Sequence, residues 1–143
     1  MFQRTLVLIK PDAVQRRLSA EILGRFESKG LRIVGMKMLR FTPELARRHY
    51  AEHIGKSFYP RLEEFICSGP CVALVLESEE VIALVRRMMG ATDRLEALPG
   101  TIRGDYAYAS TEQNLIHGSD SGASAEREIP IFFQENELFP PES

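Results

Sequence analysis

The chain contains no tryptophan and no hydrophobic run long enough to cross a membrane. The apolar stretch at residues 5–9 is followed at once by Lys10, Pro11 and Asp12, whereas a membrane helix needs about 20 apolar residues. No signal-peptide pattern precedes this stretch. We therefore expect neither a membrane partner nor export.

An excess of positive charge is also missing. The 18 Lys and Arg residues are outnumbered by 20 Asp and Glu residues, so the net charge is −2. Proteins that bind nucleic acid as their main role usually present a basic surface. The 143 residues, 44% hydrophobic and 27% charged, instead fit one domain (1–143) with small-molecule or protein partners.

Cysteine is scarce. Cys67 and Cys71 are the only two, and a structural zinc site needs about four ligands. We interpret both as small buried hydrophobic residues of a protein in the reducing cytoplasm.

Several familiar site motifs are absent or incomplete. No Gly-x-Gly-x-x-Gly occurs, and Gly55-Lys56-Ser57 lacks the first glycine of a P-loop, because Tyr50 stands there. His49 and His53 are four residues apart, but no glutamate follows the first histidine as in a metalloprotease. We interpret them as surface histidines.

The hydrophobic pattern predicts strands and helices in alternation. Strands are expected at residues 3–9, 31–41, 71–76 and 114–117. Helices are expected at residues 19–29, 42–53, 59–67, 78–89 and 121–133, with Ser19, Thr42 and Ser78 as caps of the first, second and fourth of them. Residues 91–113 have no sustained period and predict a functional loop, and residues 138–143 predict an extended tail.

This order predicts an α/β (α+β) fold of the ferredoxin-like, split βαβ type. We expect a four-stranded antiparallel sheet with helices on one face. Many functions share such folds, so the site has to be argued from its residues.

His117 is the first candidate for chemistry. Small polar residues follow it, which leaves the imidazole reachable, and Ser119 and Glu128 can form a hydrogen-bond chain that ends on one ring nitrogen. The other nitrogen is then free to act as a nucleophile, since an ordinary histidine has a pKa of about 6.5 and is mostly neutral at pH 7.

A second set of residues suits phosphate. Lys10 follows the first strand, Arg86 lies near a helix end, and Thr92 and Arg103 lie in the long loop. Arginine offers a fork of donors and lysine a point charge to phosphate oxygens. We interpret the remaining arginines of interest as surface charges: Arg47, Arg48, Arg87 and Arg94.

Five segments in order along almost the whole chain closely resemble the nucleoside diphosphate kinase family. They are KPDAVQR at residues 10–16, His49-Tyr50, SGP at 68–70, PGTIRGD at 99–105 and NLIHGSDS at 114–121. The resemblance implies a ping-pong reaction, in which a nucleoside triphosphate phosphorylates a histidine and a nucleoside diphosphate then takes the phosphate.

The resemblance also implies roles for individual residues. His117 would be the nucleophile that forms pros-phosphohistidine, and Glu128 would orient it, with Ser119 between them. Lys10 and Tyr50 would serve the transferred phosphate, and Lys10 and Asn114 would approach the ribose. The rest of the nucleotide would be held by Arg86, Thr92 and Arg103 on the phosphates and by Phe58 stacked on the base.

Stacking on Phe58 without hydrogen bonds to the base edge would accept any base. The resemblance further implies Mg²⁺, carried mainly by the nucleotide phosphates and reached by Asp120 through water. It also implies a homo-oligomer, a hexamer or a tetramer.

Four features depart from the family pattern. Arg94 stands where proline is common, and one extra residue lies between Asp105 and Asn114. Gly122-Ala123 occupies a place where an acid is common, and Pro130 should kink or end the last helix.

Two other functions fit the sequence less well. An RNA-recognition module would need aromatic residues on a central strand and a basic face, and neither is present. A phosphohistidine relay protein would leave Lys10, Arg86, Arg103 and Phe58 without a purpose.

Overall fold

The computed structural model describes residues 1–110 and 112–141. In these residues the strands are β1 (Phe2–Ile9), β2 (Arg32–Arg40), β3 (Pro70–Glu79) and β4 (Ile116–Gly118). The α-helices are α1 (Pro11–Gln15), α2 (Ser19–Ser28), α3 (Pro43–His49), α4 (Tyr59–Ile66), α5 (Val81–Met89), α6 (Ile102–Tyr106) and α7 (Gly122–Phe132). Two short 3₁₀ helices are η1 (Ala51–His53) and η2 (Glu135–Glu137).

The four strands form one antiparallel sheet in the order β2-β3-β1-β4, as the split βαβ prediction requires. Strand β1 is central and pairs with β3 along its whole length. Its other edge pairs with the short strand β4, where Leu8 lies opposite His117. The sheet therefore holds His117 beside the central strand, of which residues 5–9 are fully buried.

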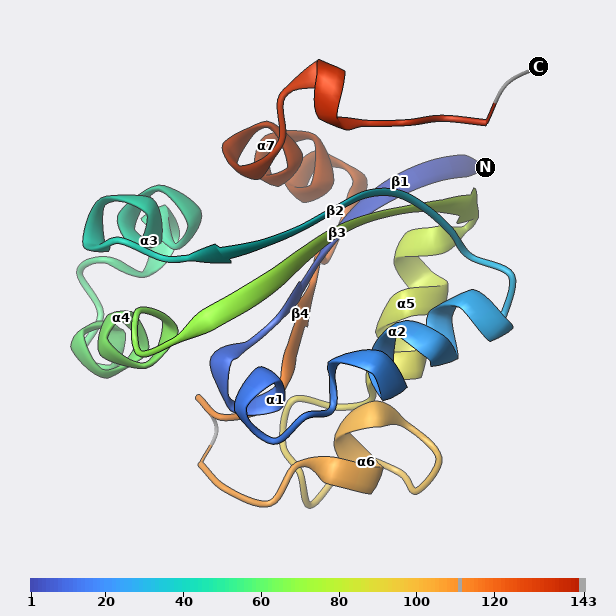
Figure 1. The fold of residues 1–143 in the computed structure, drawn as a ribbon. Helices are drawn as coiled ribbons and strands as arrows, with labels where there is room; N and C mark the ends of the chain where they lie inside the picture. Colours follow the sequence, from blue (N-terminus) through green and yellow to red (C-terminus); the bar gives the residue numbers. More distant parts are fainter. Residues whose placement is uncertain (111, 142–143) are drawn as a thin grey trace.

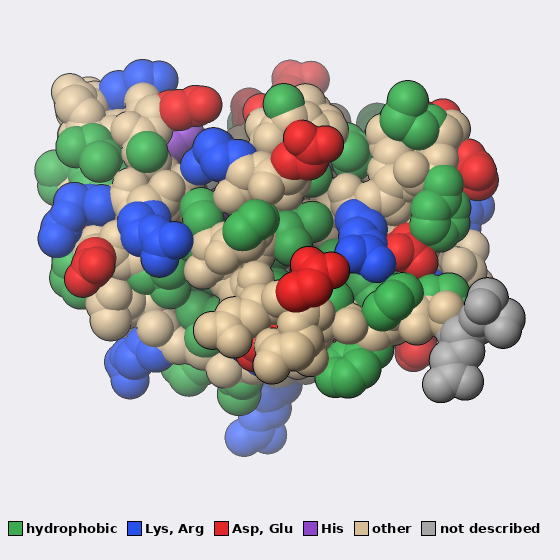
Figure 2. Space-filling view, turned by 90° about the horizontal axis from the view of Figure 1, so that it is seen from above, with side chains coloured by type: hydrophobic (Ala, Val, Ile, Leu, Met, Phe, Trp, Pro, Cys, Tyr) green, Lys and Arg blue, Asp and Glu red, His purple; other side chains and the backbone are tan. Residues whose placement is uncertain are grey.

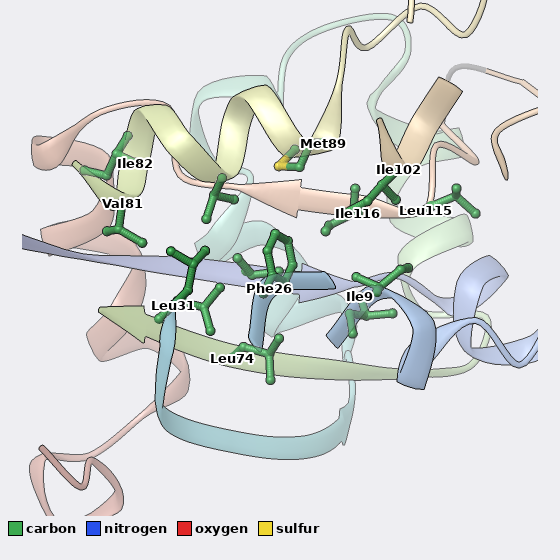
Figure 3. Close-up of a cluster of buried hydrophobic side chains, with 14 of the residues drawn as sticks. Ile9, Phe26, Leu31, Leu74, Val81, Ile82, Met89, Ile102, Leu115 and Ile116 are labelled. Atoms are coloured by element: carbon green, nitrogen blue, oxygen red, sulfur yellow. The ribbon is translucent and has the colours of Figure 1, made fainter. Parts of the chain in front are cut away.

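Helices cover both faces of the sheet, so the expectation of helices on one face was wrong (Figure 1). Val7 and Ile9 belong to a cluster with α2 and α5, whose side chains Figure 3 shows. Leu6 and Leu8 belong to a second cluster, with α3, α4 and the end of α7. All four are fully buried, and successive residues of a strand point to opposite faces, so both faces need a cover.

Two predicted helix caps were wrong. Ser19 is the first residue of α2, but the cap position is Leu18 and no side chain caps it. Ser78 lies in β3, which continues to Glu79 because it pairs there with Phe2. Helix α5 begins only at Val81, after Glu80 turns the chain with φ of 51°.

Other helix ends follow the sequence signals. Thr42 caps α3 by accepting from the Leu45 amide, and Ser121 caps α7 by accepting from the Ser124 amide. The predicted helix at 42–53 is broken at Tyr50 into α3 and η1. Pro130 lies inside α7, and the helix ends two residues later.

The predicted loop at residues 91–113 is not without structure, since it contains α6. Thr101 caps this helix by accepting from the Gly104 amide. Five-residue helices such as α6 and α1 are too short to show a hydrophobic period, so both were missed. Thr111 of the loop, and residues 142–143 of the predicted tail, lie outside the described residues. In the tail, the Phe139 amide donates to the Val34 carbonyl of β2.

Across the described part of the chain, no helix has the length and apolar character needed to cross a bilayer.

Candidate active site

His117 lies in the middle of β4, and its side chain is 23% exposed. Being paired with Leu8, it points to the sheet face that α3, α4 and the end of α7 cover. The next residue, Gly118, packs against α5 on the opposite face, where a Cβ atom would lie 2.6 Å from Met89 Sδ. Glycine at this position lets the strand approach α5 closely.

Glu128 holds one nitrogen of the His117 ring. Its Oε1 atom is 3.1 Å from His117 Nε2 and accepts a hydrogen bond of 2.6 Å from the Ser119 hydroxyl. Ser119 in turn accepts from the Leu6 amide of β1. The expectation that Ser119 lies between the two was wrong: Glu128 touches the imidazole directly and Ser119 braces Glu128 from behind.

The charge of Glu128 fixes the form of the imidazole. Burial raises the pKa of this carboxyl, but the contacts with His117 and Ser119 outweigh burial and hold the pKa below its usual value. A carboxylate can only accept, so Nε2 carries the proton of the neutral ring. Nδ1 then has the free lone pair, and no described residue hydrogen-bonds to it.

A cavity of about 210 Å³ opens in front of this ring. Among the expected site residues, its lining includes Tyr50, Arg86, His117, Asp120 and Glu128. Arg86 donates from Nη1 to the Gly118 carbonyl over 3.2 Å, which keeps its positive charge at the cavity. The Ser124 hydroxyl donates to Asp120 and is the main reason for the lowered pKa of that carboxyl.

His49 also lines this cavity, and its interpretation as a surface histidine was wrong. It is only 3% exposed, and its ring lies edge-on to that of His117 with the centroids 4.8 Å apart. Burial, and secondly His117, lower its pKa well below the usual value, so the ring is neutral. His53 is half-buried, and its ring is tilted by 57° against that of Phe58 with 5.5 Å between the centroids.

Lys10 and Asn114 form a buried polar pair. Lys10 Nζ donates to Asn114 Oδ1 over 2.8 Å. Burial, and secondly the charge of Arg103, lower the lysine pKa to about 8. Asn114 and Thr92 line a neighbouring cavity of about 210 Å³ rather than the one at His117.

Arg103 is buried and binds the protein's own backbone. It donates from Nε to the Asn114 carbonyl, from Nη1 to the Gly90 carbonyl and from Nη2 to the Ile116 carbonyl. These bonds use three of the five guanidinium hydrogens. Burial, and secondly Arg86, lower its pKa to about 10, so the group remains charged at neutral pH.

The two expected aromatic residues differ in exposure. Tyr50 is buried, its hydroxyl has no partner among the described residues, and burial raises its pKa. Phe58 is 37% exposed at the start of α4, where a flat ring can stack on it. Figure 2 shows a histidine side chain recessed beside basic and acidic side chains, and charges of both signs interspersed over that face.

The remaining expectations concern structural residues. Cys71 is buried as expected, whereas Cys67 is half-buried, and both are free thiols. The four arginines interpreted as surface charges, Arg47, Arg48, Arg87 and Arg94, are exposed.

Residues missed from the sequence reach the cavity from α3, η1 and α7. They are His49, Glu52, His53, Ser124 and Arg127. His49 had a signal, because it stands in the His49-Tyr50 segment of the family pattern. The arrangement can hold a charged ligand over an imidazole that Glu128 orients, with Nδ1 left free.

Comparisons with known proteins point to one family. The family model described as nucleoside diphosphate kinase matches residues 3–138. The chain is 60% identical over 136 residues to the nucleoside diphosphate kinase of Rhodopirellula baltica, covering 95% of this chain and 89% of that one. It is 57% identical over 136 residues to that of Thermus thermophilus, covering 95% and 98%.

Two solved structures carry informative ligands. A halophilic nucleoside diphosphate kinase from Halobacterium salinarum in complex with CDP is 48% identical, with a TM-score of 0.95 over 100% of this chain and 95% of that one. A transition-state mimic of the Borrelia burgdorferi enzyme, with vanadate and ADP, is 38% identical, with a TM-score of 0.92 over 99% and 93%.

Proposed function

This chain belongs to the nucleoside diphosphate kinase family, and we propose that it transfers the γ-phosphate between nucleotides through phosphohistidine at Nδ1 of His117. The observation that carries the assignment of the atom is the contact of Nε2 with Glu128. Because Nε2 carries the proton that it donates to Glu128, Nδ1 is the nitrogen that can attack.

The reaction has two matched steps. The Nδ1 lone pair of His117 attacks the γ-phosphorus, the bond from phosphorus to the β-phosphate oxygen breaks, and the nucleoside diphosphate leaves. An oxygen of the terminal phosphate of a second diphosphate then attacks the phosphorus, and the P–N bond breaks. Glu128 stabilises the positive charge that His117 develops, and Ser119 keeps Glu128 in place.

The remaining family positions would bind the nucleotide. Arg86 and Arg103 would neutralise phosphate oxygens, since Arg86 lines the cavity and Arg103 keeps two donor hydrogens beyond its backbone bonds. Thr92 would add a neutral donor. The buried Tyr50 hydroxyl and Lys10 would serve the transferred phosphate, with Lys10 and Asn114 near the ribose.

Phe58 would stack on the base without reading its edge. The loop at 91–113 would then act as a functional loop of one domain, residues 1–143, whose tail begins at about residue 138.

Mg²⁺ would accompany the nucleotide. The carboxylate of Asp120 lines the cavity, and its lowered pKa keeps it ionised at neutral pH. One carboxylate fits an ion that keeps several waters and binds mainly to phosphate oxygens. When bound, Mg²⁺ neutralises phosphate charge, and Asp120 would hold it through water.

The protein would work as a homo-oligomer, a hexamer or a tetramer. Strand β2 is an edge of the sheet and exposes Met36 and Met38, and Leu95 and Leu98 are exposed near the long loop. Light scattering after size exclusion measures the assembly.

Two free thiols are compatible with a cytoplasmic enzyme.

Labelling tests the mechanism. Labelled ATP should place phosphate on the protein, mild acid should release it, and GDP or CDP should accept it. His117→Ala should abolish labelling and exchange and leave the fold intact. Turnover by this variant would contradict the covalent scheme, whereas label that no diphosphate accepts would favour the phosphohistidine relay.

A further inference from the structure

His49, His117 and Glu128 form a cluster of potential metal ligands at the base of the cavity. One nitrogen of each histidine and one carboxylate oxygen all lie within 4.8 Å of one another. The three residues come from α3, β4 and α7, so the cluster joins both sides of the cavity. Phosphate transfer as proposed above uses His117 and Glu128 and gives His49 no role.

His49 is the unexplained member. Both of its ring nitrogens are buried without a hydrogen-bond partner among the described residues. Its neighbours are aromatic: Phe41, Tyr50 and Phe132 pack around it. Leaving a buried polar group unpaired is unfavourable, and a metal ion would satisfy one of these nitrogens.

We propose that His49, His117 and Glu128 bind one Zn²⁺ ion, or a similar borderline transition-metal ion, with the fourth position open to the cavity. Two histidines and one glutamate are a ligand set that proteins use for zinc with an open position. His117 Nε2 and Glu128 Oε1 are already 3.1 Å apart, close to the roughly 3.3 Å between two ligands of a tetrahedral ion. Mg²⁺ prefers oxygen ligands, so this site differs from that of the nucleotide metal.

Bound metal would switch off the nucleophile. Coordination through Nε2 requires the proton of the neutral ring to sit on Nδ1, and Nδ1 then has no free lone pair. The positive charge of Arg127, whose Nη2 is 3.5 Å from Glu128 Oε2, would repel the ion, as would that of Arg86 in the cavity lining. Zn²⁺ should therefore block the attack of His117 on ATP, a consequence that rests on the proposed function.

Cobalt titration tests the binding itself. Nucleotide-free protein titrated with Co²⁺ should show the visible absorption of a tetrahedral ion, saturating at one ion per chain, and Zn²⁺ should abolish it. His49→Phe keeps the aromatic packing and should weaken Zn²⁺ binding at least about 100-fold. Mutating a residue that only hydrogen-bonds to a metal ligand already lowers metal affinity about 10- to 100-fold. Thermal unfolding of this variant checks its fold.

His53→Gln is the matched control, because His53 lines the same cavity outside the cluster. It should leave the Co²⁺ spectrum unchanged. A missing tetrahedral band, or one that persists in folded His49→Phe, would overturn the site. Protein loaded with one Zn²⁺ ion and freed of excess metal should take up no label from ATP, and normal labelling of the loaded protein would overturn this block. If ATP labels His117 normally but the protein binds no metal, the metal site is wrong and the proposed function stands.

Discussion

Arg103 donates a hydrogen bond from Nη2 to the main-chain carbonyl of Ile116 over 2.7 Å, one residue before His117. The same side chain reaches the Gly90 carbonyl at the end of α5. A residue that resembles a phosphate clamp thus also ties β4 to the beginning of the long loop. We therefore expect nucleotide binding and folding to be coupled through this one guanidinium.

Arg103→Ala should therefore lower both stability and nucleotide affinity. Losing these charge-assisted bonds to buried carbonyls should reduce the free energy of unfolding by about 3 kcal/mol. Arg86→Ala is the control: Arg86 is exposed and makes one backbone contact, so mainly ADP affinity should fall. Urea unfolding and calorimetric ADP titration measure the two effects, and equal stability losses would contradict this distinction.

Glu128→Gln should slow exchange more than Ser119→Ala. Glu128 touches the His117 ring, and a lost bond to a charged group of about 1.5–3 kcal/mol corresponds to about 10- to 100-fold in rate. Ser119 contacts Glu128 and the Leu6 amide and reaches the ring only through Glu128, so its loss should cost about 10-fold or less. Single-turnover labelling by ATP reports these rates, and the reverse order would mean that Ser119 acts on the ring itself.

Lys10 should make the enzyme sensitive to alkaline pH. Its pKa is about 8 in the folded protein against an ordinary value of 10.5, so the folded state loses the proton first. Between these values the unfolded chain binds more protons, and stability should rise with pH. Nucleotide binding should weaken over the same range, because a positive charge is lost.

The Michaelis constant for ADP and the urea midpoint, followed from pH 7 to about 10, measure these opposite trends. Lys10→Met should remove both pH dependences. A Michaelis constant that stays flat in the parent protein would show that the charge of Lys10 does not assist binding.

Gly104→Ala should destabilise the protein strongly. A Cβ atom there would lie 1.9 Å from the Leu98 carbonyl oxygen, so the backbone around α6 would have to shift, at about 2–3 kcal/mol. Gly122→Ala is the matched control: nothing lies within 4 Å of its Cβ position, and alanine favours α7. Thermal unfolding of both variants should show a large loss for the first and little change, or a gain, for the second.

Long periodic segments were predictable because their pattern is local. The strand at residues 3–9 and the helix at 19–29 agree with β1 and α2 to within a residue or two. The predicted start of the helix at residues 78–89 was wrong, since Ser78 has the chemistry of a helix cap but pairing with β1 extends β3 past it and α5 begins only at Val81. Tertiary pairing there overrides the local signal.

The candidate site was likewise predictable only in part from the sequence. Residue chemistry singled out His117, Ser119 and Glu128 before any coordinates, but their order of contact had to come from the fold. His49 shows the limit most clearly. Its spacing from His53 gave a surface interpretation, whereas packing of α3 against β4 and α7 buries it beside His117.

The sequence by itself determined the alternation of strands and helices, the family, and the residue types available for phosphate chemistry, because these depend on local periodicity and on motif spacing. Only the tertiary structure decided that both faces of the sheet are covered, that Arg103 anchors β4, and that two histidines and a glutamate meet in one cavity. Such meetings join residues far apart in the chain, and they depend on how whole helices pack on the sheet rather than on any local pattern.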